Sequence, residues 1–306
     1  MTVRSSRVLI LGAHGMLGRT VFEWFARRGW NVAGTHFRDP GSSGYLDATL
    51  DPREWSSILV SSRCDYAINC VGILKNAVCE HDAESVNKAI QVNALFPYSL
   101  ARVAALQDAR VIHISTDGVF AESGSRPYSE SDPPDCRDHY GRSKALGECP
   151  APNVLNIRCS LAGRDPVNGK GLLEWLLRQP EDSEVPGFRD QLWNGVTTLQ
   201  LAQLAEAIID QPGRFESARG LSAVHHFCPN PAITKYDLLC AWQRVTGKRL
   251  TIRPAESGSP GRLLATIYSA LPALYRAPGG WDEILGELLL KDELLANAPS
   301  TKDPSI

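Results

Sequence analysis

A phenol and an ammonium lie four residues apart in the stretch DHYGRSKALGE, at Tyr140 and Lys144. That spacing is about one turn of an α-helix, so the two side chains would share a helix face. A free phenol has a pKa of about 10 and is a poor acid at neutral pH, but a neighbouring ammonium would lower that pKa. The pair could then serve acid–base catalysis, although the spacing alone is also typical of a solvated helix surface.

Three polar residues end the stretch VIHIST-D, where Ser115, Thr116 and Asp117 follow an apolar run typical of a buried strand. Ligands of open α/β sheets bind at the carboxyl ends of the strands. The hydroxyl of Thr116 is therefore predicted to hydrogen-bond a substrate oxygen beside the phenol. Thr116, Tyr140 and Lys144 together predict the polarisation and protonation of a carbonyl as a hydride arrives.

A glycine triplet, Gly12, Gly15 and Gly18, follows the apolar run VLIL near the start of the chain. An amphipathic helical pattern comes directly after it, so the spacing G-x-x-G-x-x-G joins a predicted strand to a predicted helix. Glycine allows a tight turn and close approach of the backbone to a pyrophosphate, and the helix start supplies free N–H groups. This context favours a dinucleotide site over a glycine-rich turn without a ligand.

The end of the second predicted strand, GTHFRD, bears on the choice of dinucleotide. NAD sites usually offer an acid there to the ribose 2′-hydroxyl, whereas an arginine suits a 2′-phosphate. His36 stands where the acid is expected and Arg38 follows, so NADP(H) is favoured over NAD(H), which Asp39 keeps open. Phe37 and Arg38 are included among the predicted cofactor-binding residues.

Strand-like runs alternate with helical patterns through the first half of the chain, from RVLILG, MLGRTVFEWFARRG and WNVAGTHF onward. One long helix is predicted for ESVNKAIQVNALFPYSLARVAAL. Such alternation indicates βαβ units and a parallel sheet. The predicted fold class is α/β, with a doubly wound parallel sheet (a Rossmann domain) over residues 1–160.

The pattern loosens past residue 161, and residues 161–306 are predicted to form mainly a smaller substrate-binding lobe. Two helices are clear in it, LQLAQLAEAIIDQ and ITKYDLLCAWQRVTG, the second with Thr234 as its N-cap. Part of residues 192–225 is expected to return to the Rossmann domain.

The composition excludes several classes of function. A formal net charge of -2 over 306 residues offers no basic surface for DNA, RNA or an anionic membrane. No apolar run approaches the roughly 20 residues that span a bilayer, and the apolar run near the start fits a first strand better than a signal peptide. The 8 cysteines form no C-x-x-C pair, which indicates reduced thiols and a cytoplasmic location.

One stretch, VHHFC, places His225, His226 and Cys228 close together. Its neighbourhood is strand-like and apolar, and the sequence offers no second pair of ligands. No metal site is predicted, because a zinc site would need four such ligands at suitable spacing.

Several motifs resemble those of the extended short-chain dehydrogenase/reductases, and within them the dTDP-4-dehydrorhamnose reductases and related nucleotide-sugar 4-ketoreductases. The resemblance rests on GAHGMLGRTV, ISTDGVF, YGRSKALGE, IRCSLAGR and DQLWNGVTTLQLAQLAEAI. It spans nearly the whole chain and thins out after about residue 210. It implies a Rossmann fold, a nucleotide-sugar substrate, NADPH-dependent reduction of a 4-keto group and a homodimer.

The resemblance also implies roles for individual residues. It implies Thr116, Tyr140 and Lys144 as the catalytic residues. It implies a set of cofactor contacts along the dinucleotide: Gly12, Gly15, Met16 and Leu17 at the pyrophosphate, Asp47 near the adenine, and Cys70, Val71 and Gly72 along its central part. It implies that Arg158 and Ser160 approach the nicotinamide or the sugar. The full set of predicted substrate residues is Asp117, Arg158, Ser160, Trp193 and Arg262.

Three departures from the family pattern concern the substrate side. Family members usually have a tyrosine after S-T-D, where this chain has Gly118. The region DQLWNGVTT carries Trp193 and Asn194 as additions, and only Arg262 in GSPGRLLATIYSALP is comparable with the usual C-terminal sugar-binding segment. The reaction type is expected to survive these changes, whereas the identity of the sugar stays open.

Three other functions are alternatives to reduction of a nucleotide sugar. A 4,6-dehydratase would need an Asp-Glu pair after the threonine, and Gly118 disfavours it. An NAD-dependent epimerase would keep the Tyr/Lys pair and stays open. The regulatory subunit of methionine adenosyltransferase, which the chain resembles even in GTHFR, would bind NADP without turnover, and the intact Tyr140–Lys144 pair weighs against this alternative.

Overall fold

The computed structural model describes residues 6–296 with the exception of positions 123, 125, 167, 170 and 212, and only the backbone of 292–296. The end of the predicted C-terminal lobe, residues 297–306, lies outside the described residues. Within the described ranges, no helix is both long enough and apolar enough to cross a membrane.

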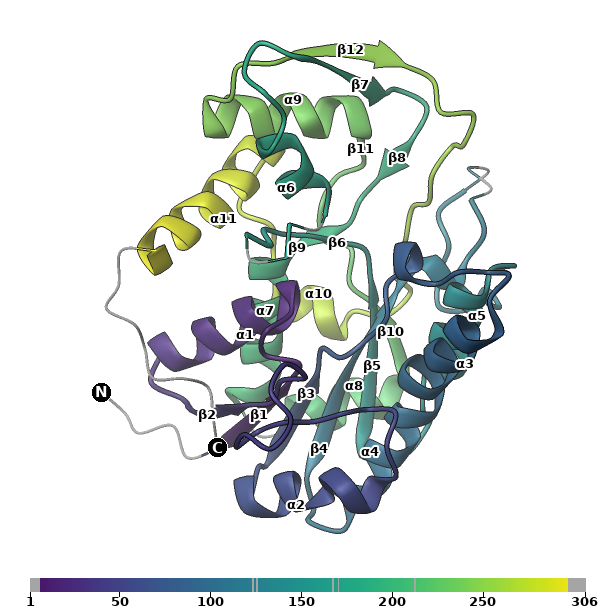
Figure 1. Cartoon of the computed structure of the whole chain (residues 1–306), viewed down its shortest axis with the longest axis vertical. Coiled ribbons are helices and arrows are strands. Elements are labelled where there is room, and N and C mark those ends of the chain that lie inside the picture. The colour runs from purple at the N-terminus through teal and green to yellow at the C-terminus, as the bar shows by residue number, and fades with distance from the viewer. Residues whose placement is uncertain are drawn as a thin grey trace.

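A parallel sheet of six strands forms the centre of the molecule, in the order β10-β5-β4-β3-β1-β2 (Figure 1). Its strands in chain order are β1 (Arg7–Leu11), β2 (Asn31–Gly34), β3 (Tyr66–Asn69), β4 (Arg110–Thr116), β5 (Val154–Cys159) and β10 (Val224–His226). The alternation of strands and helices along the chain produces this all-parallel order. The predicted α/β class with a doubly wound Rossmann-type sheet is confirmed.

Beside β2, an isolated parallel bridge joins His36 to Tyr45. The backbone N–H of Leu46 donates to the carbonyl of His36 over 2.7 Å, so the chain runs alongside the end of β2 for only a few residues. Pro40 and the left-handed glycines Gly41 (φ 93°) and Gly44 (φ 82°) turn the chain here. In the six-stranded sheet, β2 lies on one side of β1 and β3 on the other, so the strand order changes direction between β1 and β3. Such a point is where these sheets bind nucleotides.

Helices cover both faces of the sheet (Figure 1). One face packs on α1 (Met16–Arg27), α7 (Thr198–Ile209), α8 (Arg214–Leu221) and α10 (Ala270–Leu274). The other face carries α2 (Pro52–Ser62), α3 (Ala83–Ala89), α4 (Phe96–Ala105) and α5 (His139–Leu146). Segments from the second half of the chain, α7, α8, β10 and α10, thus lie with the sheet.

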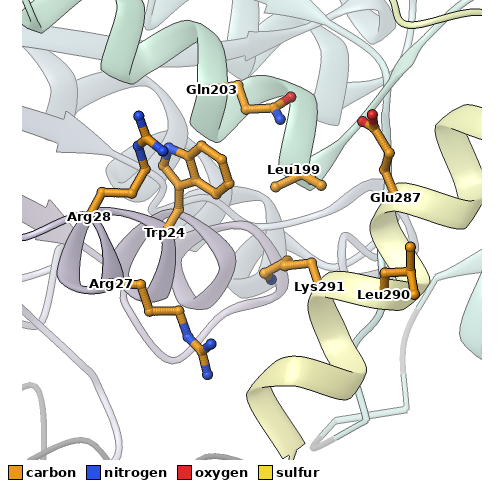
Figure 2. Close-up of a pocket in the computed structure, with 8 residues that line it drawn as sticks. All are labelled: Trp24, Arg27, Arg28, Leu199, Gln203, Glu287, Leu290 and Lys291. Carbon is orange, nitrogen blue, oxygen red and sulfur yellow. The ribbon is translucent and has the colours of Figure 1, made fainter.

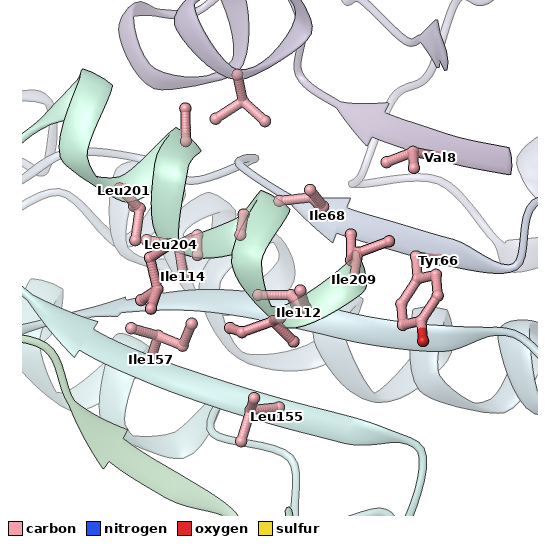
Figure 3. Close-up of a cluster of buried hydrophobic side chains, with 14 of the residues drawn as sticks. Val8, Tyr66, Ile68, Ile112, Ile114, Leu155, Ile157, Leu201, Leu204 and Ile209 are labelled. Atoms are coloured by element: carbon pink, nitrogen blue, oxygen red, sulfur yellow. The ribbon is translucent and has the colours of Figure 1, made fainter. Parts of the chain in front are cut away.

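Strand β1 shows why its sequence is a continuous apolar run. Val8 and Ile10 enter the cluster under α1 and α7, whereas Leu9 and Leu11 enter the cluster under α2 and α4. Figure 3 shows the first of these clusters, with the side chains of β1, β3, β4 and β5 facing those of α7. A strand that is buried on both faces has no polar side to present, which removes the alternation seen in half-exposed strands.

The long helix predicted over 84–106 is interrupted. Helix α3 ends at Ala89, a π-helical segment η2 (Ile90–Leu95) follows, and α4 begins at Phe96. Pro97 lacks an N–H and its ring conflicts with the carbonyl four residues earlier, that of Asn93. That carbonyl is approached by Gly147, where an added Cβ would lie 1.9 Å from it, so the wide turn is a packing surface for the end of α5.

The C-terminal lobe lies over the carboxyl edge of the sheet (Figure 1). Its elements are α6 (Leu172–Leu177), β7 (Glu184–Phe188), β8 (Leu192–Trp193), β11 (Ile233–Thr234), α9 (Lys235–Thr246), β12 (Thr251–Ala255) and α11 (Trp281–Ala296), and β6 (Leu161–Ala162) pairs with β9 (Val196–Thr197) at its base. Trp193, Trp242 and Trp281 belong to its own hydrophobic core. The lobe is therefore built around a centre separate from the sheet.

Two of the predicted helices of the second half are confirmed. Helix α7 begins at a capping box in which Thr197 and Gln200 bond each other's backbone N–H. Helix α9 begins after Thr234, whose hydroxyl accepts the N–H of Asp237 over 3.0 Å, as predicted for an N-cap.

Candidate active site and cofactor cradle

Helix α5 carries Tyr140 and Lys144, and its position is fixed at both ends of its first turn. Asp138 caps the helix by accepting the N–H of Gly141 over 2.7 Å. Gly141 packs directly on the turn after β4, since an added Cβ would lie 2.3 Å from the carbonyl oxygen of Gly118. This contact holds the first turn of the helix against the end of β4.

The ring of Tyr140 occupies the space beside Gly118. A Cβ on Gly118 would lie 2.9 Å from Cε1 of Tyr140 and 3.3 Å from Oγ1 of Thr116. A tyrosine at position 118, as the family pattern has, would require these side chains to move. The absence of a side chain at Gly118, which departs from the family pattern, thus leaves the space in which Tyr140 lies beside Thr116.

Thr116 ends β4 and caps the short η3 (Asp117–Val119). Its hydroxyl accepts the N–H of Gly118 over 3.0 Å and donates to Oδ1 of Asp117 over 3.1 Å. The same hydroxyl interacts with the phenol of Tyr140. The structure therefore brings together the strand end and the helix turn that the sequence predicts to act on one oxygen.

The acidity of Tyr140 differs from the prediction. Burial raises the pKa of Tyr140 to about 12, and the contact with Thr116 opposes that rise only in part. The charged groups with the largest effect on it are Asp117, Arg262 and Asp138, and Lys144 is not among them. The expected lowering of the phenol pKa by Lys144 is thus not seen, because the ammonium is directed elsewhere.

Lys144 is buried, with 5 % of its surface exposed, and its Nζ donates to the carbonyl oxygen of Ile114 over 2.8 Å. Burial lowers the pKa of Lys144 to about 8, against the opposing charge of Glu148. A Cβ on Gly72 would lie 3.9 Å from this Nζ. The ammonium therefore sits between β4 and the segment after β3 that is predicted to contact the cofactor.

Arg158 is placed differently from the prediction that it approaches the substrate. It is 4 % exposed on β5, and its guanidinium donates twice to Glu148, over 2.7 and 2.6 Å. Ser115 also donates to Glu148, over 2.7 Å. The bidentate pair uses Arg158 inside the protein, where it holds Glu148 close to Lys144. The sequence analysis missed Glu148, which lies four residues after Lys144 and just past the end of α5.

Asn93 is a second polar residue that the sequence analysis missed. It is buried in the π-helical segment, accepts the N–H of Ile73 over 2.8 Å and donates to the Ile73 carbonyl over 3.1 Å. It also donates to Oγ of Ser143 over 3.2 Å. Asn93 thereby connects the segment after β3 to helix α5, and the break in the helical pattern at Pro97 is the signal that could have indicated it.

The glycine triplet forms a cradle between β1 and α1. Gly12 has φ of 81°, which favours glycine, and a Cβ on it would lie 3.2 Å from Val71. A Cβ on Gly18 would lie 2.1 Å from the carbonyl oxygen of Gly12, so only glycine lets the helix pack on the turn. Helix α1 has no side-chain cap at Gly15 and no acid in its first turn.

This arrangement fits a dinucleotide pyrophosphate. The first N–H groups of α1, including those of Met16 and Leu17, have no intrahelical acceptor, and the helix start favours negative charge. Val71 and Cys70 border the turn from β3, and the N–H of Cys70 donates to the carbonyl of Leu11 over 3.1 Å. The predicted pyrophosphate contacts are therefore adjacent to one another.

The residues predicted for the adenosine end of the cofactor gather after β2. Phe37 is 56 % exposed and stacks on Tyr45 with 5.9 Å between ring centroids. Nη2 of Arg38 donates to Oδ1 of Asn168 over 2.7 Å, and Asn168 lies between β6 and α6. Asp47 is partly buried, and its Oδ1 accepts from the backbone N–H and hydroxyl of Thr49.

On the substrate side, the predicted residues Asp117 and Arg262 meet across 145 positions of sequence. Nε of Arg262 lies 3.4 Å from Oδ2 of Asp117, and Nη1 lies 3.2 Å from a carboxylate oxygen of Glu122. Nη1 also donates to the carbonyl of Phe120 over 3.3 Å. Ser160 lies at the base of the lobe, where its carbonyl accepts the N–H of Val196 over 2.8 Å.

Trp193 lies in the core of the C-terminal lobe, in place of the predicted contact with substrate. It is 5 % exposed and its ring packs on Trp281 with 5.2 Å between centroids. Its neighbour Asn194 donates to the carbonyl of Leu264 over 2.7 Å and accepts the Leu264 N–H over 3.0 Å. Both additions to the family pattern thus have packing or tethering contacts.

A cavity of about 300 Å³ lies away from these residues, between α1, α7 and α11 (Figure 2). It is lined by eight residues: Trp24, Arg27, Arg28, Leu199, Gln203, Glu287, Leu290 and Lys291. None of the predicted catalytic, cofactor or substrate residues is among them. The cavity is therefore separate from the candidate active site.

The two histidines of VHHFC have different backbone partners. Nε2 of His225 lies 2.8 Å from the carbonyl oxygen of Ala218, and Nδ1 of His226 lies 2.8 Å from that of Ala265. Among the residues that the structure describes, no group of three potential ligands is arranged to hold a metal ion.

Several known proteins resemble this chain in sequence. Over 242 residues it is 26% identical to methionine adenosyltransferase 2 subunit beta of Danio rerio, covering 77% of this chain and 72% of that protein. Over 149 residues it is 36% identical to dTDP-4-dehydrorhamnose reductase of Streptomyces griseus, covering 49% of this chain and 46% of that protein.

Solved structures share the fold. One is dTDP-4-dehydrorhamnose reductase of Bacillus anthracis in complex with NADP, with a TM-score of 0.76 at 20% identity, covering 94% of this chain and 99% of that one. Another is WbmG of Bordetella bronchiseptica in complex with NAD, with a TM-score of 0.70 at 16% identity, covering 96% of this chain and 96% of that one.

Most of the sequence also matches one protein family. Residues 6–264 match the family described as RmlD substrate binding domain. The match includes the glycine cradle, the end of β4, helix α5 and the predicted substrate residue Arg262. The resemblance on which the sequence analysis relied is confirmed at the level of the family, and the chain belongs to the RmlD substrate binding domain family.

Proposed function

We propose that this protein is an NADPH-dependent reductase of the 4-keto group of a nucleotide-activated deoxysugar. The closeness of Thr116 and Tyr140, whose side chains both lie beside Gly118 at the end of β4, carries the proposal, because one substrate oxygen can accept hydrogen bonds from two neighbouring hydroxyls. Lys144 and the glycine cradle border the same edge. The family membership and the reductases that share the fold support the choice of reaction.

In the proposed reaction, a bound nicotinamide supplies the hydride that reduces the carbonyl carbon. Thr116 turns its hydroxyl hydrogen from Asp117 to the carbonyl oxygen, so that Thr116 and Tyr140 both hold that oxygen by hydrogen bonds, and Tyr140 gives it the proton that completes the alcohol. With a pKa of about 12, Tyr140 holds its proton at neutral pH and is a donor. The proton donor works best where negative charge develops on the oxygen, which the two hydroxyls stabilise most strongly in the transition state.

Lys144 has one proposed task at this site. Its ammonium is charged for the larger part of the population at neutral pH, because its pKa is about 8. Its place beside Gly72 suits a hydrogen bond to the ribose of the cofactor. The Arg158–Glu148 pair beneath it fixes an opposite charge near the ammonium.

NADP(H) is the proposed cofactor. The exposed guanidinium of Arg38 follows β2, and no acid stands at position 36. A 2′-phosphate would take the place of Asn168 as the partner of Arg38. Arg38→Ala should weaken NADPH binding about tenfold or more while changing NADH little, since one charge-assisted contact is worth about 1.5–3 kcal/mol.

Titration of cofactor fluorescence with purified variants measures both affinities. Arg53→Ala is the matched control, because Arg53 is an exposed arginine of α2 that pairs with Asp51. If Arg38→Ala weakens NADPH and NADH equally, the guanidinium supports the fold of the loop, and the proposed preference for NADPH is lost.

A second candidate is a regulatory subunit that binds NADP without turnover. The 26% identity to methionine adenosyltransferase 2 subunit beta over 77% of this chain favours it. The arrangement of Tyr140 and Lys144 on α5 favours the reductase, because a protein that only binds NADP needs no proton donor beside the strand end. An NAD-dependent epimerase would use the same pair with a tightly held cofactor.

Steady-state oxidation of NADPH in the presence of dTDP-4-dehydrorhamnose separates these candidates. The reductase consumes NADPH in proportion to the sugar nucleotide added. A regulatory subunit binds NADPH and leaves it unoxidised, and an epimerase changes the sugar without net oxidation. Absence of oxidation with this and other 4-keto nucleotide sugars would overturn the proposed function.

A further inference from the structure

Lys235 is the first residue of helix α9. It lies near the segment of the predicted substrate residue Arg262, because Leu192, which follows the backbone partner of Lys235, forms a bridge with Gly261. Strand β11 leads into the helix and pairs with β8, so that Ile233 lies opposite Trp193. The ammonium of Lys235 stands 4.7 Å from the centroid of the Trp193 ring. Its backbone N–H donates to the carbonyl of Gln191 over 3.0 Å, which fixes where the side chain begins.

The position of this ammonium is unfavourable for the folded chain taken by itself. A cation in the first turn of a helix faces the positive end of the helix dipole, which costs roughly 0.3–1 kcal/mol. The side chain is partly buried, and that burial lowers the pKa of Lys235. Apart from the Trp193 ring, the ammonium makes no ion pair or hydrogen bond with any described residue.

The surroundings of Lys235 are the charged groups next to Tyr140. Asp117, Arg262 and Glu122 all act on the ammonium. Both carboxylates pair with Arg262, at 3.4 and 3.2 Å. Asp117 and Arg262 also act on the phenol of Tyr140. Lys235 is therefore within electrostatic reach of these groups, whose two carboxylates both have Arg262 as their ion-pair partner.

We propose that Lys235 binds a phosphate oxygen of the substrate and so recognises the diphosphate of a nucleotide sugar. This inference rests on the proposed function and adds the residue that anchors the anionic half of the substrate. In a pyranose, the 4-keto oxygen and the anomeric diphosphate lie at opposite ends of the ring. With the keto oxygen at Tyr140, the diphosphate extends away from α5, and the ammonium of Lys235 supplies a compact positive charge for it.

The start of α9 strengthens this assignment. Thr234 caps the helix through the N–H of Asp237, and the positive end of the helix dipole adds to the charge of Lys235. The charge of Lys235 and the positive end of the helix dipole repel each other, which destabilises the protein without ligand. A doubly charged ligand offsets this repulsion. A sugar hydroxyl would gain much less from the same arrangement, because it carries no charge.

Calorimetric binding of dTDP and UDP to the protein saturated with NADP⁺ tests the proposal. Lys235→Met keeps the length of the side chain and its packing on Trp193 but removes the charge. It should weaken both nucleoside diphosphates about tenfold or more, in line with loss of a charged hydrogen bond. Lys235→Arg should retain most of the affinity, and NADP⁺ binding should be unchanged in both variants.

Lys248→Met is the matched control, since Lys248 lies after the other end of α9 and pairs with Glu181 over 2.9 Å. A thermal unfolding curve of each variant establishes that it is folded. The wild-type affinity should also fall with added salt more steeply than that of Lys235→Met, because counterions compete for the same charge.

Three results would overturn the assignment: Lys235→Met and Lys248→Met bind dTDP and UDP equally well, Lys235→Arg binds as weakly as Lys235→Met, or the wild type binds neither diphosphate. The assay needs no turnover. If the diphosphates bind in a Lys235-dependent way but NADPH is never oxidised, the reductase proposal fails and the role of Lys235 stands.

Discussion

At the scale of single residues, the site places its two predicted hydroxyls together but keeps its ammonium apart from the phenol. Tyr140 is held beside Thr116 by the absence of a side chain at Gly118. Lys144 instead donates to the carbonyl of Ile114. The proposed proton donor and the proposed cofactor contact are thus separate residues with separate tests.

Tyr140→Phe should remove most of the turnover and leave NADPH affinity unchanged. The ring still packs beside Gly118 and the cradle is untouched, while the proton donor is lost, which typically costs about 10²–10⁴-fold in rate. Tyr98→Phe, on the exposed side of α4, is the control. Steady-state kinetics and cofactor titration measure both effects, and a variant with more than half of the wild-type rate would show that Tyr140 is not the acid.

Lys144→Met should lower turnover and cofactor affinity yet stabilise the fold at neutral pH. The folded-state pKa of about 8 lies below the ordinary value of 10.5, so burying the charged form costs roughly 3 kcal/mol. Losing the bond to Ile114 costs about 1 kcal/mol in return. The unfolding free energy at pH 7 should therefore rise by about 2 kcal/mol.

The pH dependence gives the sign of this effect. Between pH 8 and 10.5 the unfolded chain binds more protons at Lys144 than the folded chain, so the wild type gains stability from this group as pH rises. The advantage of Lys144→Met should shrink over that window in urea unfolding at a series of pH values. A variant less stable than the wild type at pH 7 would mean that the buried ammonium stabilises the fold.

At the scale of elements, the parts of the fold set by local pattern could be predicted from the sequence. The apolar run at β1, the glycine triplet before α1 and the N-cap Thr234 of α9 each carry their signal within a few residues. Pro97 could indicate a break in the helix, but the π-helical form of η2 could not be read from helical periodicity, because Gly147 of a distant segment packs there against the Asn93 carbonyl.

Gly18→Ala should destabilise the protein and abolish dinucleotide binding. A Cβ at this position lies 2.1 Å from the carbonyl oxygen of Gly12, so α1 must move off the turn, at a cost of about 3 kcal/mol. Gly15→Ala, whose Cβ meets that oxygen at an ordinary 3.4 Å, should keep the fold. Gly220→Ala in α8 has open space and is the neutral control, and chemical unfolding of all three variants ranks them.

A Gly18→Ala variant as stable as Gly220→Ala would contradict the close approach of α1 to the turn. Retention of NADPH binding in a stable Gly18→Ala variant would further remove the cradle from the proposed cofactor site.

At the scale of the whole molecule, the site is assembled from both halves of the chain. Arg262 reaches Asp117, Asn194 bonds to Leu264, and Glu130 accepts from Thr266 over 2.6 Å. These contacts tie the segment around Arg262 to the sheet edge and to the base of the lobe. The substrate side is therefore set by pairings between residues far apart in sequence.

Such pairings explain why the surroundings of two predicted substrate residues could not be read from the sequence. Arginine and tryptophan often bind sugars, but inside this protein Arg158 forms an ion pair with Glu148 and Trp193 packs on Trp281. The side chain of Lys235 was not singled out, because its first-turn position has meaning only beside Trp193 and Arg262. The sequence shows the type of each residue, whereas its burial and its contacts depend on the folded chain.

The transfer of hydride to the sugar tests the central claim most directly. NADPH carrying deuterium in both hydrogen positions of nicotinamide C4 is incubated with the protein and dTDP-4-dehydrorhamnose, and the product is analysed by mass spectrometry and NMR. The proposed function predicts one deuterium on C4 of the sugar for each NADPH oxidised, and a loss of this product in Tyr140→Phe. Oxidation without deuterium at C4, or the same labelled product at the wild-type rate from Tyr140→Phe, would contradict it.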